Sequence, residues 1–309
     1  MCLILKANGY GVGMVPLAKA LQHEVEMLAV AHTTEALALR DAGISAPIFV
    51  IHASRGDFAP GFAYGVSDET TIDCFGSSGA SYELHLHVDT GMGRLGCQLE
   101  DAEFLIQKIE SYPNLTLSGL FSHLAAADDP DEDLFTHQQY LKFKSVFEKY
   151  TAKWVHLANS AGHLRFNFPG CNLARIGLAL FTQTPVLRLD SHIVSIQKCQ
   201  TGASVGYGRK WKNSGESKWI ATLPFGYHDG LSPHFDGTVV IRGKKAAVVG
   251  GLCMDYMMVD VTQFRELSLG DPVEIFGSVQ SIEEVALMCG YNCHQLLATI
   301  GPRIIRCYS

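Results

Sequence analysis

The sequence lacks the features that mark membrane proteins and nucleic-acid-binding proteins. No apolar run approaches the length of a membrane span, and the formal net charge of -7 is dispersed, without a basic stripe or an acidic tail. Internal repeats and low-complexity segments are also missing. The nine cysteines are scattered, and the one close pair, Cys289 and Cys293, has no cluster of histidines or cysteines that would complete a metal site. These absences make small-molecule chemistry and reduced thiols the expectation.

The start of the chain also lacks a secretion signal, because the apolar run over residues 1–5 is short and has no basic lead. We therefore expect a cytoplasmic protein with no membrane partner and no nucleic-acid partner. What the sequence does have is a length of 309 residues, which is enough for two domains. Its composition, 47% hydrophobic and 18% charged residues, is that of an ordinary globular protein with a sizeable core.

Up to about Pro185, short apolar runs alternate with amphipathic stretches. Helical periodicity is clearest in residues 33–42, 100–111 and 134–150, whereas residues 68–75 are compatible with a short helix or a loop. Strands that alternate with helices predict a parallel (β/α)8 TIM barrel of the α/β class. The eight expected strands are residues 2–6, 25–31, 47–51, 62–66, 84–89, 115–122, 154–158 and 173–181.

Beyond Pro185 the pattern changes to strand-like alternation with turn signals, and helical periodicity returns only at residues 282–289. We therefore expect a barrel domain over residues 1–185 and a mostly β C-terminal domain over residues 186–309. The expected strands of the second domain are residues 187–199, 218–223, 238–241, 246–249, 257–261 and 273–276.

A glycine-rich stretch, Lys6-Ala7-Asn8-Gly9-Tyr10-Gly11-Val12-Gly13, directly follows the first apolar run. A lysine at the carboxyl end of a buried strand lies where barrel enzymes place their chemistry. Loss of water lowers a lysine pKa, and the neutral amine can then form a Schiff base with a carbonyl cofactor. The glycines let backbone N–H groups approach a phosphate closely, and Tyr10 adds a hydroxyl. Taken alone, such a lysine is more often just the solvated end of a strand.

The stretch resembles the cofactor-lysine motif of the alanine racemase family, and further motifs of that family follow in chain order across nearly the whole sequence. They are Val88-Asp89-Thr90-Gly91-Met92-Gly93-Arg94-Leu95-Gly96, Ser122-His123, His156-Leu157-Ala158-Asn159-Ser160, Arg175-Ile176-Gly177, Val205-Gly206-Tyr207-Gly208, residues 223–230, Cys253-Met254-Asp255 and Gly301-Pro302-Arg303.

The resemblance implies a racemase that interconverts L-alanine and D-alanine, a peptidoglycan precursor, with pyridoxal 5'-phosphate (PLP) as cofactor. It implies that Lys6 binds PLP and that Lys6 and Tyr207 act as two bases on opposite faces of the substrate. An unperturbed tyrosine titrates at about pH 10, so a base at Tyr207 needs nearby positive charge or hydrogen bonds. By itself, Tyr207 is also compatible with a structural aromatic residue in a β turn.

The resemblance also implies the cofactor contacts. Arg175 would face the pyridine nitrogen of PLP, and a permanent donor there leaves that nitrogen unprotonated and discourages side reactions. His123 would stack on the cofactor ring, although a lone strand histidine is also typical of a core. Ser160 could equally cap a helix. The phosphate contacts would be Tyr10, Ser160, Ile176 and Gly177.

Arg94, by the same resemblance, meets the substrate carboxylate together with the backbone N–H of Met254. Many relatives have a lysine seven positions before this arginine, often carbamylated, whereas this chain has His87. Imidazole cannot carry that carbamate, so a bound halide or an acidic side chain would have to orient Arg94. His85 and His87 share one strand face, which could suggest a metal pair, but we expect buried, hydrogen-bonded histidines and no metal.

Several alternatives stay open from the sequence. Serine and broad-specificity racemases use the same scaffold, and an inactive truncated homologue would also match the motifs. A non-catalytic PLP-binding protein would keep the lysine barrel, although such relatives generally lack the second domain. Relatives usually have a strand and a helix before the lysine motif, so the sequence suggests a shortened form or a misplaced start. The resemblance implies a homodimer with shared active sites and a small amino acid as substrate.

Overall fold

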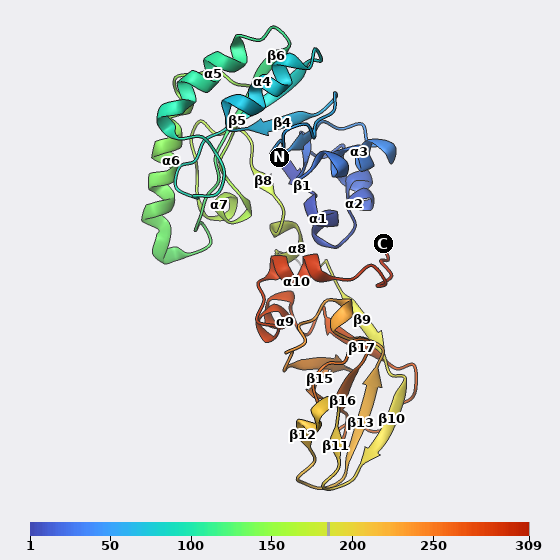
Figure 1. Cartoon of the computed structure of the whole chain (residues 1–309). Coiled ribbons are helices and arrows are strands. Elements are labelled where there is room, and N and C mark those ends of the chain that lie inside the picture. The colour runs from blue at the N-terminus through green and yellow to red at the C-terminus, as the bar shows by residue number, and fades with distance from the viewer. Residues whose placement is uncertain (184–185, 309) are drawn as a thin grey trace. The chain divides into compact units, whose positions relative to one another are not determined.

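The computed structural model describes residues 1–183 and 186–308, and the chain divides into two compact units, Met1–Ala179 and Leu180–Ser309 (Figure 1). The domain boundary that we predicted after Pro185 falls on residues 184–185, which lie outside the described residues. Each unit is therefore described by itself.

Eight parallel strands form one nearly closed sheet in the first unit. Their order is β7-β6-β5-β4-β3-β2-β1-β8, so β1 pairs with both β2 and β8. The predicted barrel and its eight strands are confirmed. The strands are β1 (Cys2–Ile4), β2 (Met27–Val30), β3 (Ile48–Val50), β4 (Ala63–Val66), β5 (Tyr82–His87), β6 (Leu115–Phe121), β7 (Trp154–His156) and β8 (Arg175–Ile176).

The remaining seam of the barrel lies between β7 and β8, where backbone hydrogen bonds bring the two segments together. The Arg175 N–H donates to the Ala158 carbonyl at 2.9 Å, and the Leu173 N–H donates to the Val155 carbonyl at 3.4 Å. Several of the expected strands extend beyond the observed ones. In particular, Lys6 lies beyond β1, at the start of the short segment α1, and residues 179–182 form a helix rather than the end of β8.

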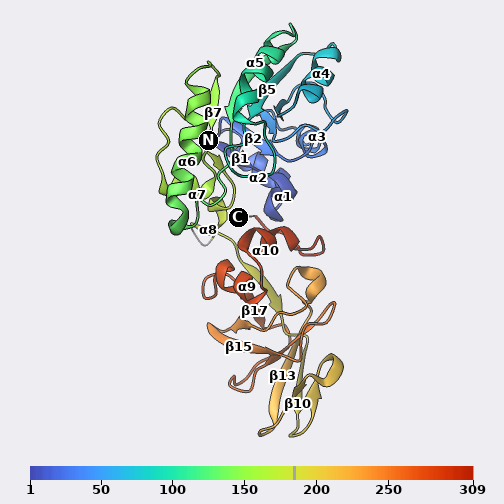
Figure 2. The same cartoon turned by 60° about the vertical axis from the view of Figure 1, so that its left-hand side comes forward.

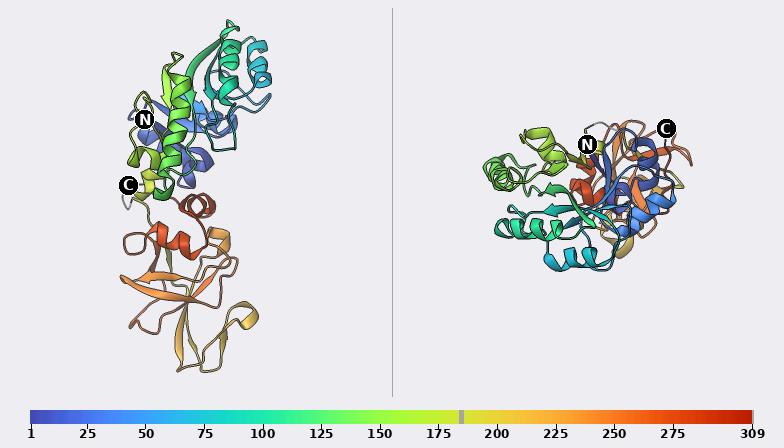
Figure 3. Two further views of the ribbon diagram at one scale, coloured as in Figure 1. Left: turned by 90° about the vertical axis from the view of Figure 1, so that its left-hand side faces the viewer. Right: turned by 90° about the horizontal axis from the view of Figure 1, so that it is seen from above.

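The strands are apolar because both faces of a parallel barrel sheet are covered. Leu3, Leu28, Phe49 and Leu84 are fully buried, and helices α3 to α6 lie outside the strands (Figures 2 and 3). Among the described residues, no helix is both long and apolar enough to cross a membrane. The helices of this part are α1 (Lys6–Tyr10), α2 (Met14–Leu21), α3 (Thr33–Asp41), α4 (Glu69–Ser77), α5 (Ala102–Glu110), α6 (Asp133–Phe147), α7 (Ser160–Arg165) and α8 (Ala179–Thr182), with 3-10 turns η1 (Leu99–Asp101) and η2 (Pro130–Glu132).

The fourth crossover, which the sequence left open, is helix α4. Asp68 precedes it as N-cap, and the Asp68 carboxylate accepts hydrogen bonds from the Thr71 N–H at 2.9 Å and from the Thr71 hydroxyl at 2.7 Å. Such a cap stabilises a short helix by satisfying a backbone donor that has no partner within the helix. The aspartate therefore explains why this weakly periodic segment is helical.

The second unit is built on an antiparallel sheet of order β10-β13-β16-β15-β14-β17-β9, with a separate hairpin of β11 and β12 (Figure 1). The predicted strand over residues 187–199 is two strands, and helix α10 was not predicted. The elements are β9 (Leu189–His192), β10 (Ser195–Cys199), β11 (Ser204–Val205), η3 (Tyr207–Arg209), β12 (Trp211–Lys212), β13 (Lys218–Leu223), η4 (Tyr227–Asp229), β14 (Thr238–Ile241), β15 (Lys244–Val249), β16 (Met257–Asp260), β17 (Pro272–Phe276), α9 (Ile282–Met288) and α10 (Cys293–Thr299).

Candidate active site

Lys6 begins a left-handed turn at the carboxyl end of β1. Residues 7 to 10 have φ values of 54°, 54°, 61° and 55°, and only Gly9 among them is a glycine. Ala7, Asn8 and Tyr10 are therefore strained, because a left-handed conformation brings Cβ close to the following carbonyl. The turn is closed by backbone hydrogen bonds, in which the Gly9 N–H donates to the Leu5 carbonyl at 2.7 Å.

Glu35, at the start of α3, holds this turn, and sequence reasoning missed it. Its carboxylate accepts hydrogen bonds from the N–H groups of Ala7 and Ala31, both at 2.8 Å, and of His32 at 3.3 Å. A carboxylate that binds backbone N–H groups makes charge-assisted hydrogen bonds, which are stronger than neutral ones. The only signal in the sequence was an acidic residue in the first turn of a predicted helix.

The Lys6 amine is half-buried and makes no hydrogen bond or ion pair within residues 1–183 and 186–308. Burial lowers its pKa, the positive charges of Arg94 and Arg175 lower it further, and the carboxylate of Glu35 acts in the opposite direction. A lysine with a lowered pKa provides more neutral amine at neutral pH, and the neutral amine is the nucleophile and the base.

Arg175 in β8 is buried, with 5% of its surface exposed, and its guanidinium lies among histidines and carbonyl groups. It approaches the Nδ1 atom of His156 at 3.0 Å and the Nδ1 atom of His123 at 3.1 Å. Burial lowers the pKa of Arg175 to about 10, so the guanidinium stays charged at neutral pH. Burial and the charge of Arg175 also lower the pKa of His123 to about 2, so that ring is neutral. Arg175 and His123, which we predicted as cofactor contacts, therefore lie in contact with each other.

Tyr10, Ser160 and Gly177 come together from the segments after β1, β7 and β8. A Cβ atom at Gly177 would lie 2.2 Å from the Tyr10 hydroxyl oxygen, so only glycine fits beside this ring. The Ser160 hydroxyl accepts from the Gly177 N–H at 3.1 Å. The cap of α7 is Asn159 rather than Ser160, because the Asn159 side chain accepts from the Gly162 N–H at 2.9 Å. Ile176, the fourth predicted phosphate contact, lies in β8 directly before Gly177.

Arg94 lies in a loop that Asp89 closes. One carboxylate oxygen of Asp89 accepts from the N–H groups of Gly91 at 2.9 Å and Met92 at 2.8 Å. The Arg94 side chain is exposed and forms no ion pair with any carboxylate among the described residues. An acidic side chain that orients Arg94, one of our two alternatives, is therefore not present within the described barrel.

His87, which stands where relatives have a lysine, is buried with 4% of its surface exposed. Its ring stacks on Phe121 with a centroid distance of 4.2 Å, and its Nδ1 atom has no hydrogen-bond partner among the described residues. Its strand neighbour His85 does hydrogen bond, to His156 at 2.9 Å, as we expected of a core histidine. The two histidines of β5 therefore have different environments.

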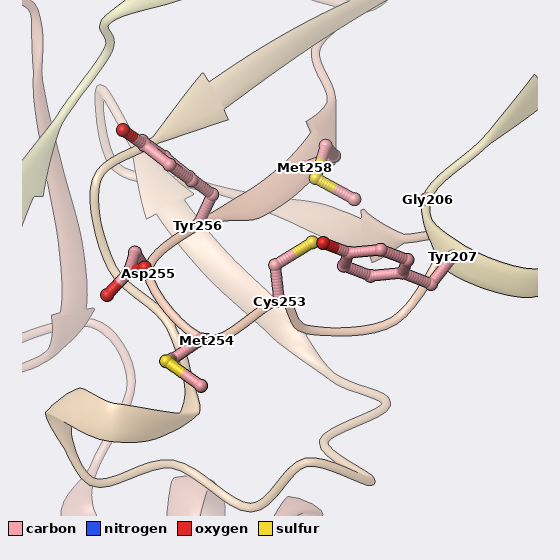
Figure 4. A pocket seen from close by; sticks show the side chains of 7 residues that line it. All are labelled: Gly206, Tyr207, Cys253, Met254, Asp255, Tyr256 and Met258. Atoms are coloured by element: carbon pink, nitrogen blue, oxygen red, sulfur yellow. The ribbon is translucent and has the colours of Figure 1, made fainter.

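Tyr207 and Met254 lie together in the second unit, at a pocket of about 470 Å³. Tyr207 begins turn η3, its side chain is 79% exposed, and its ring points toward the segment that contains Cys253 and Met254 (Figure 4). Within the described chain the Tyr207 hydroxyl and the Met254 N–H make no hydrogen bond. The pocket is lined by Gly206, Tyr207, Cys253, Met254, Asp255, Tyr256 and Met258.

Three of the sequence motifs in the second unit meet at the Arg303 guanidinium. The sequence analysis quoted the motif of Arg303 but assigned no role to this residue. Arg303 forms two hydrogen bonds with the Asp229 carboxylate, at 2.5 and 2.8 Å, and one with Asp255 at 2.6 Å. The His228 N–H donates to the Met254 carbonyl at 3.1 Å. This bidentate pairing fixes the loop that presents Met254.

Comparisons with known proteins agree with this geometry. The model of the N-terminal domain of alanine racemase matches residues 1–185, and that of the C-terminal domain matches residues 186–308. The chain belongs to the alanine racemase family. The alanine racemase of Geobacillus stearothermophilus is 35% identical, over 99% of this chain and 86% of the relative.

Solved structures of family members resemble the chain over its whole length. The biosynthetic alanine racemase of Pseudomonas aeruginosa has a TM-score of 0.91 and 28% identity, over all of this chain and 92% of that one. The alanine racemase of Bartonella henselae, described with covalently bound pyridoxal phosphate, has a TM-score of 0.90 and 26% identity at coverages of 100% and 92%.

The residues of this alanine racemase family member fit such a cofactor. Gly177 leaves space where a Cβ atom would overlap Tyr10, the Ser160 hydroxyl lies beside it, and the Lys6 amine has no other partner among the described residues. The positive charges of Arg94 and Arg175 are close enough to add to the effect of burial in lowering the pKa of Lys6. Two positive side chains at one site suit an anionic cofactor and a carboxylate substrate.

The buried histidines predict how stability depends on pH. Burial, with the charge of Arg175, lowers the pKa of His87 to about 3. As the pH falls from about 6.5, the unfolded chain binds a proton at this residue before the folded chain does, so stability is lost. We expect His87→Phe, which keeps a ring against Phe121, to reduce the slope of unfolding free energy between about pH 5 and pH 6 by about 1 kcal/mol per pH unit.

Urea unfolding at several pH values would measure this slope. His137→Phe, at an exposed position of α6, is the matched control and should leave the slope as in the unmodified chain. An identical slope in the His87 variant and the control would show that His87 is not held neutral by the fold.

Proposed function

We propose that this chain is a PLP-dependent alanine racemase with Lys6 and Tyr207 as its two bases. The observation that carries the proposal is the Lys6 amine, which is half-buried, has no partner in the described chain, and has its pKa lowered by burial and by two arginines. It lies at the carboxyl end of a barrel strand, the face that carries barrel active sites.

The barrel side chains would hold and orient the cofactor. PLP, when bound, supplies an electron sink that makes the α-proton of an amino acid acidic enough for ordinary side chains to remove. The Lys6 amine would bind the cofactor, and Tyr10, Ser160 and the backbone of Ile176 and Gly177 would hold its phosphate. His123 would cover the ring and Arg175 would face the ring nitrogen.

Two bases on opposite faces would exchange the α-proton. The Lys6 amine, once released, would serve one face, and the Tyr207 hydroxyl would serve the other. Tyr207 is exposed and its hydroxyl has no hydrogen bond within the described chain, so the groups that would orient this hydroxyl as a base would come from elsewhere. This is one reason to propose a shared site.

The substrate is proposed to be alanine. The relatives and solved structures named above carry the name alanine racemase, which favours alanine over serine as the substrate. The chain has both family domains and presents Tyr207 and Met254 at one pocket, which argues against a non-catalytic PLP-binding protein. Arg94 and the Met254 N–H would bind the carboxylate of the amino acid.

We further propose a cytoplasmic homodimer that supplies D-alanine as a peptidoglycan precursor. All nine cysteines are free thiols, as a reducing compartment favours. In the second unit, Tyr207, Met254 and Tyr256 are 79%, 54% and 48% exposed at one pocket, and exposed apolar side chains gathered in this way are typical of an interface. We also place the domain boundary between residues 185 and 186.

Lys6 should carry the cofactor. We expect purified protein to absorb visible light, and borohydride should fix the cofactor to the peptide that contains Lys6, because only a lysine in covalent contact is trapped. Lys6→Ala should remove the absorbance, whereas the exposed Lys19→Ala should keep it. Mass spectrometry that finds the tag on a different lysine would refute the assignment.

Arg94 should bind the substrate carboxylate without help from a carbamate. Arg94→Ala should lower kcat/KM. The corresponding loss of transition-state stabilisation should be about 1.5 to 3 kcal/mol, the contribution of a hydrogen bond to a charged group. Because imidazole cannot carry a carbamate, bicarbonate should have no effect on activity, whereas chloride should change it if a halide orients Arg94. Steady-state kinetics would measure both, with the exposed Arg265→Ala as the control. An unchanged kcat/KM in the Arg94 variant would remove this residue from the site.

The two bases should come from different subunits. Lys6→Ala and Tyr207→Phe should each be inactive, since loss of a general base costs roughly a hundredfold or more. When the two variants are unfolded together and refolded as a mixture, half of the randomly paired dimers are mixed, and each mixed dimer has one intact site of two. About a quarter of the normal activity should therefore return.

Confirmed heterodimers without activity would mean that one chain supplies both bases. Refolding each variant alone controls for recovery during the procedure, and native mass spectrometry of the mixture would establish the fraction of heterodimers.

A further inference from the structure

Arg175 is a buried cation without an acidic partner. Its NH1 group donates to the His156 carbonyl at 2.9 Å and meets the His156 Nδ1 atom at 3.0 Å. Its NH2 group donates to the Ser122 carbonyl at 2.7 Å and to the Leu157 carbonyl at 3.1 Å. Among the described residues no carboxylate lies within ion-pair distance. Neutral acceptors alone therefore hold the guanidinium.

These contacts determine where the ring protons lie. A guanidinium can only donate, so the His156 Nδ1 atom must be an unprotonated acceptor. A neutral His156 ring then carries its proton on Nε2, which lies 2.9 Å from the Nδ1 atom of His85. His85 must accept that proton's hydrogen bond, so its own proton is on Nε2. One arrangement of protons satisfies the chain from Arg175 through His156 to His85.

The last member of this series of hydrogen-bonded side chains, His85, shows that the arrangement costs folding free energy. His85 and His156 are both fully buried, and the His85 Nε2 atom has no hydrogen-bond partner among the described residues. Burial, together with the charge of Arg175, lowers the pKa of His85 to about 3 and that of His156 well below its ordinary value, so both rings are neutral. A leucine at position 85 would avoid the buried donor but would offer His156 no acceptor.

We propose that His85 is a positioning residue, which fixes the tautomer of His156 by accepting its Nε2 proton and so gives the Arg175 guanidinium a nitrogen acceptor. This inference rests on the proposed function, in which Arg175 faces the cofactor ring. With the opposite tautomer, the His156 Nδ1–H would point at the Arg175 N–H, and two donors would face each other. The guanidinium would then move from its place.

The packing around His85 supports a fixed ring. The ring stacks on Phe49 with a centroid distance of 4.5 Å and an interplanar angle of 24°. Gly119 lies against it, where a Cβ atom would come within 2.5 Å of the His85 Nδ1 atom. His156 in turn stacks on Phe121 at 4.9 Å and 8°. Neither ring can rotate without displacing its neighbours, so their nitrogens keep their directions.

Two substitutions at position 85 test the proposal on the cofactor-loaded protein, and the two new side chains have similar shapes. His85→Asn places an amide oxygen where the Nδ1 acceptor lies, whereas the leucine of His85→Leu is close to asparagine in size and offers no acceptor. We expect the asparagine variant to keep the His156 proton on Nε2 and to keep kcat within a few fold. We expect the leucine variant to show mixed His156 tautomers and a kcat lowered by about tenfold or more, with KM little changed.

Nitrogen-15 spectra of histidine-labelled protein report which histidine ring nitrogen carries the proton. The visible absorption of the bound cofactor as a function of pH reports whether the cofactor's pyridine nitrogen is protonated. Equal losses in both variants would show a merely structural role and overturn the proposal, as would an unchanged leucine variant. If the leucine variant does not fold, the unmodified protein decides, because a His156 proton on Nδ1 would contradict the chain of donors. Failure of the proposed function would appear separately, as protein without visible absorbance or racemase activity, in which the tautomers can still be measured.

Discussion

The buried positive charge of Arg175 is the constraint on which the barrel site depends. A guanidinium in a dry interior is unfavourable unless its donors are satisfied, and the usual solution is a carboxylate. Here the donors meet carbonyl groups and two neutral imidazoles instead. The charge is therefore not neutralised locally. Burial is the main cause of the lowered pKa values of Lys6, His123 and His156, and the charge of Arg175 lowers them further. In the proposed function, this uncompensated charge would favour the binding of an anionic phosphate and a substrate carboxylate.

The strained turn after β1 brings Lys6 close to this buried charge. Lys6 must leave the barrel strand and present its amine near Arg94 and Arg175, although like charges repel it. The left-handed residues 7 to 10 cost energy, and the Glu35 carboxylate offsets part of this cost by binding the Ala7 N–H. Its negative charge also opposes the two arginines at Lys6. Glu35 thus stabilises the geometry of the turn and limits the electrostatic cost of placing a lysine there.

Much of the fold could be predicted from the sequence, because barrel strands are continuous apolar runs between turn signals, and all eight were found. The limits of β1 and β8 were wrong because apolar residues continue into the turn and the helix that follow them. Helix α10 was missed because its start depends on the cap that Asn292 provides to the Gln295 N–H, a single side-chain contact at 2.8 Å. The positions of Lys6, Arg94 and Arg175 were predicted from motifs. The roles of Glu35, His85 and Arg303 could not be predicted, because each depends on a partner far away in the sequence.

The two proposed bases differ in how the fold treats them. The surroundings of Lys6 are complete within the first unit, since burial and two arginines there already lower its pKa. Tyr207 belongs to the second unit, is exposed, and has no described hydrogen bond to its hydroxyl. The loop that contains Met254 is nevertheless held, because Arg303 pairs with the carboxylates of Asp229 and of Asp255, the residue after Met254. In the homodimer that we propose, a surface of the partner subunit would bury the tyrosine and supply the positive charge that a phenolic base requires.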